Sequence, residues 1–420
     1  MTKTQRSELF VGTAKIDITP KDLTGLTNLW GRPFKGIHDP IFLRALVLTS
    51  GDNITAIVAA DLVEFGDTFS LRERIAREIG IPADQILITA SHDHNAPRAG
   101  AVSPGAIARV GGPETLAYTK VVYDQIVDVI RQAKENLQPA KFGVGTGAAD
   151  VNTNRDAFTP EGWRIGENPE GPSEKTVWVV KFEDLSGKPI AFLINYAVHS
   201  VVIGPKNELV TGDLAGEVAR YVEHNHQDQC LALWTMGAAG DQNPKYMREF
   251  KKSNDHDGQS DYDLMKALGL ILGEEVLRVS KQIKRTTSIV RLTAEERAVP
   301  LPSWIPLRHR KDNAHRPEGH GITVQEVDTV DLRLGLILIN QLAITSASGE
   351  VNTKIYQRLK KESPLSNTMM ITLANDRLGY IVEDAAYDVP THETMGTPIQ
   401  RGFAEDAIIN NLVEMINQHL

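Results

Sequence analysis

Imidazole and carboxylate side chains stand directly after apolar runs that have the composition of buried strands. The run at 85–90 is followed by His92 and His94, and later runs are followed by His199 and Glu350. In α/β sheets, ligand sites form beyond the carboxyl ends of the strands, where loops from different strands converge. Two histidines and a carboxylate around an open coordination position are typical of a catalytic zinc site. The pattern therefore predicts a metal site at these strand ends.

His92 and His94 are two residues apart, so their side chains point to the same side if the backbone stays extended. Such a pair suits one metal ligand and one further functional group, although two surface histidines at a turn have the same spacing. The neighbouring carboxylates also have structural interpretations. Asp213 could cap a helix and Asp241 could form a turn. Asp61 could be a structural residue at the end of a strand, and Glu350 could be the first residue of a helix.

The elements that would position these side chains are short apolar runs alternating with longer segments of helical period. The runs predicted as buried strands are 55–61, 85–90, 189–198, 230–236 and 334–345. Their continuous apolar character indicates sheets covered on both faces. The segments predicted as helices are 70–80, 115–137, 213–225, 263–283, 350–362 and 404–420. This order, mostly strand and then helix, predicts an α/β fold.

Composition excludes several classes of protein. The chain has 420 residues, a net charge of -9 and a hydrophobic fraction of 41%. It lacks the basic stripe that nucleic-acid binding needs, and no apolar run approaches the roughly 20 residues of a membrane helix.

Cys230 is the only cysteine and is predicted to be a small buried hydrophobe, so neither disulfides nor thiolate ligands are expected. The N-terminus shows no secretory signal, so we expect a cytoplasmic protein.

No composition shift marks a linker, and we expect a single domain over 1–420. The polar, proline-rich segment 302–321 is predicted to be an inserted loop or lid. It contains three histidines without a strand behind them, which we interpret as solvated rather than as ligands: His309, His315 and His320.

Nine blocks follow one another along the chain: VGTAKIDITP, GIHDPIFLRALVL, TASHDHNAP, VNTNRD, NYAVHS, TGDLAGE, GAAGDQNP, SGEVNTKIYQRL and LGYIVEDAAYDVPTHE. They stand in the order found in the neutral ceramidase superfamily, which the sequence resembles over nearly its whole length. It implies an α/β catalytic domain with two packed mixed sheets flanked by helices. It also implies that the zinc ligands are His92, His199, Glu350 and Tyr380, and that His94 and Arg155 line the substrate site.

The sequence departs from the family pattern at several points. Family members continue into an immunoglobulin-like C-terminal domain, which is not seen before Leu420. A second tyrosine near the family's metal is replaced by His392, and NAPRAG, with Arg98, follows the histidine pair in place of a glycine-rich stretch. Because Arg98 and Arg155 favour a polar or anionic group, we expect a small or polar substrate rather than ceramide.

We therefore expect a zinc-dependent hydrolase that cleaves an amide, or else an ester or lactone, with metal-activated water. His94 would carry a proton to the departing amine, because imidazole titrates near neutrality. Arg155 and Tyr380 would stabilise the oxyanion, and His392 would replace the missing tyrosine's hydrogen bond.

Two alternatives remain at this point. The same scaffold could hydrolyse a glycosidic or phosphoester bond, with Asp61, Asp93 or Asp241 contributing carboxylates. A zinc-stabilised binding protein without turnover is the second alternative. With oxygen ligands in the set, Mn or Fe is an alternative to Zn. The expected partner is a small molecule, without nucleic acid or stable membrane insertion, and a homo-oligomer is left open.

Overall fold

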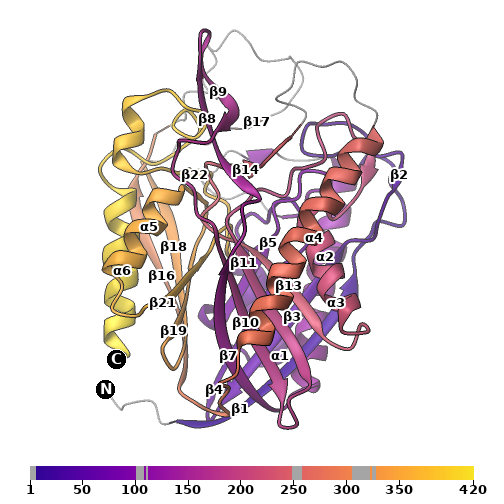
Figure 1. The fold of residues 1–420 in the computed structure, drawn as a ribbon, viewed down its shortest axis with the longest axis vertical. Helices are drawn as coiled ribbons and strands as arrows, with labels where there is room; N and C mark the ends of the chain where they lie inside the picture. The colour runs from indigo at the N-terminus through magenta and orange to yellow at the C-terminus, as the bar shows by residue number, and fades with distance from the viewer. Residues whose placement is uncertain (1–5, 101–107, 110–111, 248–257, 305–321, 324–327) are drawn as a thin grey trace.

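Two β-sheets pack face to face in the computed structural model, and helices cover the outer face of each (Figure 1). The structure describes residues 6–100, 108–109, 112–247, 258–304, 322–323 and 328–420. The predicted segment 302–321 lies outside the described residues from 305 onward, and so do its three histidines.

The larger sheet has nine strands in the order β13-β11-β10-β7-β1-β3-β4-β5, with β15 paired to β1. Neighbouring strands are antiparallel except for the parallel pairs β11–β13 and β4–β5. The strands are β1 (Ser7–Asp17), β3 (Phe42–Ser50), β4 (Asn53–Ala60), β5 (Ile86–Ala90), β7 (Gln138–Ala148), β10 (Thr176–Asp184), β11 (Pro189–Tyr196), β13 (Leu231–Met236) and β15 (Ile289–Val290).

The second sheet has the order β16-β18-β19-β21, formed by β16 (Leu292–Pro302), β18 (Thr329–Ile339), β19 (Leu342–Ala347) and β21 (Asn367–Ile371). The prediction of one strand over 334–345 was wrong, because this run contains parts of both β18 and β19. Asn340 adopts a left-handed conformation with φ 55°, and Ile339 pairs with Leu342 across a two-residue turn. Asparagine tolerates this conformation, which tight hairpins need.

The two sheets bury a common apolar layer between them. Val11 and Leu193 from the larger sheet and Ile339 and Met369 from the smaller one belong to one fully buried cluster. Such a layer is what continuous apolar strands predict.

Three pairs of amphipathic helices bury their apolar sides against the outer faces (Figure 1). On the larger sheet, α1 (Phe69–Ile79) and α2 (Pro113–Glu135) cover one half, and α3 (Asp213–Asn225) and α4 (Gly258–Gln282) cover the other. On the smaller sheet lie α5 (Thr353–Glu362) and α6 (Ala404–Gln418). No helix of the described residues is both long and apolar enough to cross a membrane.

Short strands and 3-10 helices lie in the connections between the elements of the two main sheets. They include β8 (Asn152–Thr159), β9 (Gly162–Asn168) and β14 (Gln242–Pro244), which form a three-stranded sheet, and the parallel pair β20 (Glu350–Val351) and β22 (Tyr380–Ile381). The remaining elements are β2 (Gly36–Ile37), β6 (Ala108–Arg109), β12 (Leu209–Val210), β17 (Ile322–Thr323) and the 3-10 helices η1 (Ala83–Gln85) and η4 (Asp384–Asp388).

Candidate metal centre

His92 follows β5, where the backbone leaves the sheet in a left-handed turn with φ 60°. The side chain is 2% exposed, and its Nδ1 lies 2.9 Å from the carbonyl oxygen of Val63. Nδ1–H therefore donates to this carbonyl, which leaves Nε2 to contact the other groups of the site. A backbone contact of this kind is how proteins orient a metal-binding histidine.

His199 follows β11 and is held in the same way. Its Nδ1 donates to the carbonyl oxygen of Gln242 at 3.0 Å, and the side chain is fully buried. Burial lowers the pKa of His199 to about 4, and the positive charge of Arg155 adds to this effect. The ring is therefore neutral at neutral pH, with its Nε2 lone pair directed into the site.

Glu350 brings a carboxylate to both histidines. Its Oε2 lies 3.2 Å from Nε2 of His92 and 3.2 Å from Nε2 of His199. Burial alone would raise the pKa of Glu350, but the two imidazoles hold it well below its usual range. The carboxylate is thus an anion in contact with one nitrogen atom of each imidazole.

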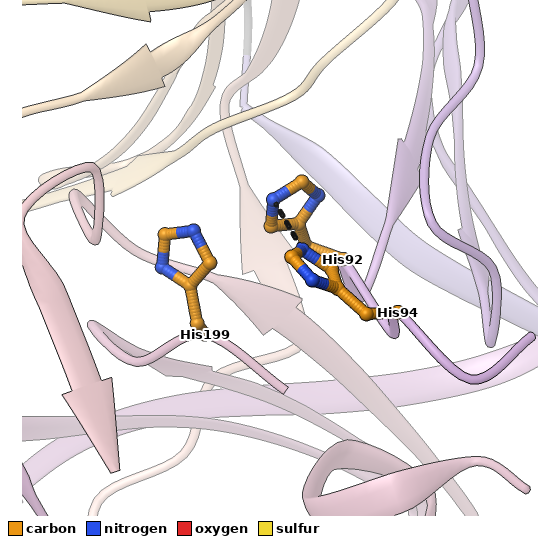
Figure 2. A group of neighbouring side chains, drawn as sticks. All are labelled: His92, His94 and His199. Atoms are coloured by element: carbon orange, nitrogen blue, oxygen red, sulfur yellow. Dashed lines mark hydrogen bonds between the residues drawn. The ribbon is translucent and has the colours of Figure 1, made fainter. Parts of the chain in front are cut away.

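His94 completes a cluster of three imidazoles that project toward one another (Figure 2). Its Nε2 is 3.1 Å from Nε2 of His92, and the donor atoms of His92, His94 and His199 lie within 4.8 Å of one another. Burial lowers the pKa of His94 well below its usual range. Among the described residues, Nδ1 of His94 has no hydrogen-bond partner.

These donors fit a metal ion. The Nε2 atoms of His92 and His199 each lie 3.2 Å from Oε2 of Glu350 in a buried site. Nitrogen and oxygen donors of this kind suit zinc and other transition metals.

Arg155 extends from β8 into the site and is 3% exposed. Its Nη2 donates to the hydroxyl of Tyr380 at 3.0 Å, and its Nη1 lies 3.1 Å from Nε2 of His199. Tyr380 is the residue paired with Glu350 between β20 and β22, which explains why both reach the same place. The assignment of Tyr380 as a metal ligand remains a prediction.

His392 lies beside Tyr380, with ring centroids 5.4 Å apart and planes at 73°. The structure thus places near one another all the site residues expected from the sequence. It adds residues that the sequence interpretation missed, namely Glu393 and Asn243, which bind Arg155, and Trp30, whose ring centroid is 5.1 Å from that of His94. Glu393 and Asn243 lie within two of the blocks that carry the family resemblance, LGYIVEDAAYDVPTHE and GAAGDQNP, but neither residue was singled out from the sequence. Trp30 lies outside these blocks, and no motif marks it.

The other carboxylates considered from the sequence have structural contacts. Asp241 accepts hydrogen bonds from the Thr353 N–H and from Asn154, and burial raises its pKa to about 6. Asp213 accepts backbone N–H groups, including one from the loop after His199. Asp61 pairs with the buried Arg44.

Arg98 does not face the site as an unengaged cation. Its Nη2 donates to the carbonyl oxygen of Leu29 at 2.7 Å, next to Trp30. Leu29 N–H in turn donates to the carbonyl oxygen of His94 at 3.0 Å. Arg98 therefore fastens the Trp30 loop to the histidine turn.

Comparison with known proteins places this geometry in context. The sequence model described as neutral/alkaline non-lysosomal ceramidase, N-terminal, matches residues 10–261. A neutral ceramidase of Oryza sativa subsp. japonica is 26% identical over 239 residues, covering 52% of this chain and 29% of that protein. Neutral ceramidase 1 of Arabidopsis thaliana is 22% identical over 308 residues, covering 68% of this chain and 38% of that protein. The chain thus matches well under half the length of these relatives.

Among solved structures, the neutral ceramidase from Pseudomonas aeruginosa has a similar fold, with a TM-score of 0.78 at 16% sequence identity. The match covers 98% of this chain and 75% of that chain. It confirms the predicted fold of two packed sheets flanked by helices.

Proposed function

The chain belongs to the neutral/alkaline non-lysosomal ceramidase family, and from this premise we propose that it is a metal-dependent hydrolase of amide bonds. The observation that carries the proposal is the meeting of His92 and His199 Nε2 atoms with one Glu350 oxygen, each at 3.2 Å. A carboxylate buried against two ring nitrogens is a ready site for a cation.

The residues that would hold the ion are His92, His199 and Glu350, with Tyr380 as the predicted fourth ligand. Zinc is our first candidate, with manganese and iron as alternatives. A bound divalent ion supplies a nucleophilic water at neutral pH and polarises the carbonyl that it faces.

The side chains around the ion would orient the substrate and move protons. Arg155 and the Tyr380 hydroxyl that it binds lie on the His199 side, where they would donate to the carbonyl oxygen as it gains charge. His94 has a ring nitrogen, Nδ1, without a partner among the described residues, and this atom would carry a proton to the departing nitrogen. His392, next to Tyr380, would help to hold the phenol ring.

The substrate has two candidate classes. The relatives are named neutral ceramidases, which makes ceramide the first compound to test. A small or polar acyl amide is the alternative that the sequence suggested from Arg98 and Arg155. Glu393 compensates the charge of Arg155, and Arg98 binds a backbone carbonyl. An anionic group on the substrate is therefore less well supported than the sequence alone suggested.

The test combines metal analysis with a substrate panel. Purified protein is analysed for bound metal as wild type, His92→Ala and His199→Ala, with His226→Ala as control, because His226 binds a carbonyl of α3 and does not belong to the cluster. We expect metal loss in the first two variants only. Equal metal content in all four proteins would contradict the assigned ligands.

The panel contains ceramide, short polar N-acyl amides, esters, lactones, aryl glycosides and phosphoesters. Turnover of an acyl amide supports the proposal and identifies the substrate class. Turnover of glycosides or phosphoesters alone would refute amide hydrolysis while leaving the metal site in place. Bound metal without turnover of any compound would favour a zinc-stabilised binding protein instead.

A further inference from the structure

Glu393 has a fully buried carboxylate that binds the guanidinium of Arg155. Its Oε1 accepts from Nε of Arg155 at 2.7 Å and lies 2.7 Å from Nη2 of the same group. A guanidinium bound through two of its nitrogens is fixed in its plane, because rotation would break both contacts.

The turn that carries Glu393 is itself well ordered by hydrogen bonds. The Glu393 carbonyl accepts the Gly396 N–H at 2.9 Å, and the Thr391 carbonyl accepts the Met395 N–H at 3.1 Å. The buried Thr394 hydroxyl donates to the Val389 carbonyl at 2.8 Å. The position of the carboxylate is therefore set by the backbone of its own turn, independently of Arg155.

The same guanidinium contacts residues of the candidate metal centre through Nη1 and Nη2. Nη2 donates to the Tyr380 hydroxyl at 3.0 Å, and Nη1 donates to Oδ1 of Asn243 at 3.1 Å. Nη1 is also 3.1 Å from Nε2 of His199. One rotation of the guanidinium would change all three contacts.

We propose that Glu393 is a positioning residue for the hydrolysis, which fixes the Arg155 guanidinium between Tyr380 and His199 so that its donors face the reacting carbonyl. The inference rests on the hydrolase function proposed above. It assigns to Glu393 an effect that acts entirely through Arg155.

Asp156 follows Arg155 in β8 and interacts electrostatically with Glu393. Burial, and then the negative charge of Glu393, raise the pKa of Asp156 to about 9. Burial would raise the pKa of Glu393, but Arg155 and the hydrogen bond from Asp156 hold it at about 2. The proton of the pair is thus on Asp156, and the negative charge stays on Glu393 beside Arg155.

The test uses the metal-loaded full chain with Glu393→Gln, which keeps the shape of the side chain and removes its charge. Glu223→Gln is the matched control, because Glu223 accepts from Nε of the buried Arg44 at 2.9 Å and makes no described contact with the histidine cluster. We expect Glu393→Gln to lower kcat by about 100-fold, the typical cost of misplacing a reacting group by 1 Å, with KM and metal content little changed. Glu223→Gln is expected to keep its kcat within about twofold of wild type.

A double-mutant cycle separates positioning from general destabilisation. Because Glu393 acts through Arg155, Glu393→Gln should lower kcat by less than about twofold in an Arg155→Gln background. A full additional loss in that background, or an equal loss of kcat in Glu223→Gln, would overturn the inference.

Crystal structures give a readout that does not depend on turnover. In Glu393→Gln we expect the Arg155 guanidinium to leave the Tyr380 hydroxyl, and an unmoved guanidinium would overturn the inference. If wild-type protein turns over no substrate of the panel, the proposed function fails, whereas this comparison still decides whether Glu393 positions Arg155.

Discussion

Removal of the metal ion should leave the Glu350 carboxylate without a divalent counter-charge, since the group is 1% exposed and faces the ring nitrogens of His92 and His199. A buried ion that loses its partner costs about 3–5 kcal/mol. For a chain of 420 residues, an unfolding entropy of about 2.1 cal/mol/K per residue gives roughly 0.9 kcal/mol/K. The metal-free protein should therefore melt roughly 3–6 °C below the metal-loaded protein.

Glu350→Gln tests this reasoning by reversing its sign. In the metal-loaded protein the variant should melt below wild type, because it binds the ion less tightly. In the presence of a chelator it should melt above wild type, because the unpaired charge is gone. Differential scanning calorimetry of both proteins, with chelator and with added zinc, measures the crossover.

A control variant separates this effect from the general cost of removing a buried carboxylate. Glu174 is also buried and forms an ion pair with Lys360, so Glu174→Gln should lower the melting temperature equally with and without metal. If metal-free Glu350→Gln melts below metal-free wild type, the carboxylate is satisfied without a cation, and the inference of a metal site from these contacts is wrong.

Three further predictions concern single side chains. His94→Gln should retain metal but lose about 10²–10⁴-fold in kcat, as expected for a proton carrier, and metal loss instead would make His94 a ligand. Because the pKa of Asp156 is raised to about 9, the folded protein holds a proton that the unfolded chain releases, and stability falls as pH rises toward 9. Asp156→Asn should flatten this decline in urea unfolding at pH 6 and 9, and parallel curves for both proteins would count against the shift. Burial raises the pKa of the Cys230 thiol to about 12, so thiol reagents at pH 8 should label it only after unfolding, and rapid labelling of native protein would contradict its burial.

The strands that lead to the site could be predicted from apolar runs because both faces of the larger sheet are covered. The run at 85–90 corresponds to β5, and the run at 189–198 contains β11, so the histidines after them were correctly placed at strand ends. Strands with polar or glycine-rich sequences were missed. β7, with the sequence QPAKFGVGTGA, is an example, since its glycines accommodate Ile283 and Val279 of the covering helical segment rather than showing an apolar face.

The histidine and carboxylate part of the site could be predicted because those residue types have few structural uses at strand ends. Glu393 was not singled out, although it ends the block LGYIVEDAAYDVPTHE, because its contact with Arg155 spans 238 positions of the chain and no local pattern indicates that contact. For Arg98, contact with substrate stays a prediction. The structure shows that its guanidinium donates to the loop of Leu29, a contact that its charge alone did not indicate.

The candidate metal centre is assembled from side chains that lie far apart in sequence, from His92 to Glu350. During synthesis the two imidazoles emerge long before Glu350, and the smaller sheet on which the carboxylate depends is formed by residues 292–371. Pairings of such long range form late in folding, because the entropy of closing the loops has to be overcome first. A nascent chain therefore cannot trap the ion in a partial site, and metal capture coincides with completion of the fold.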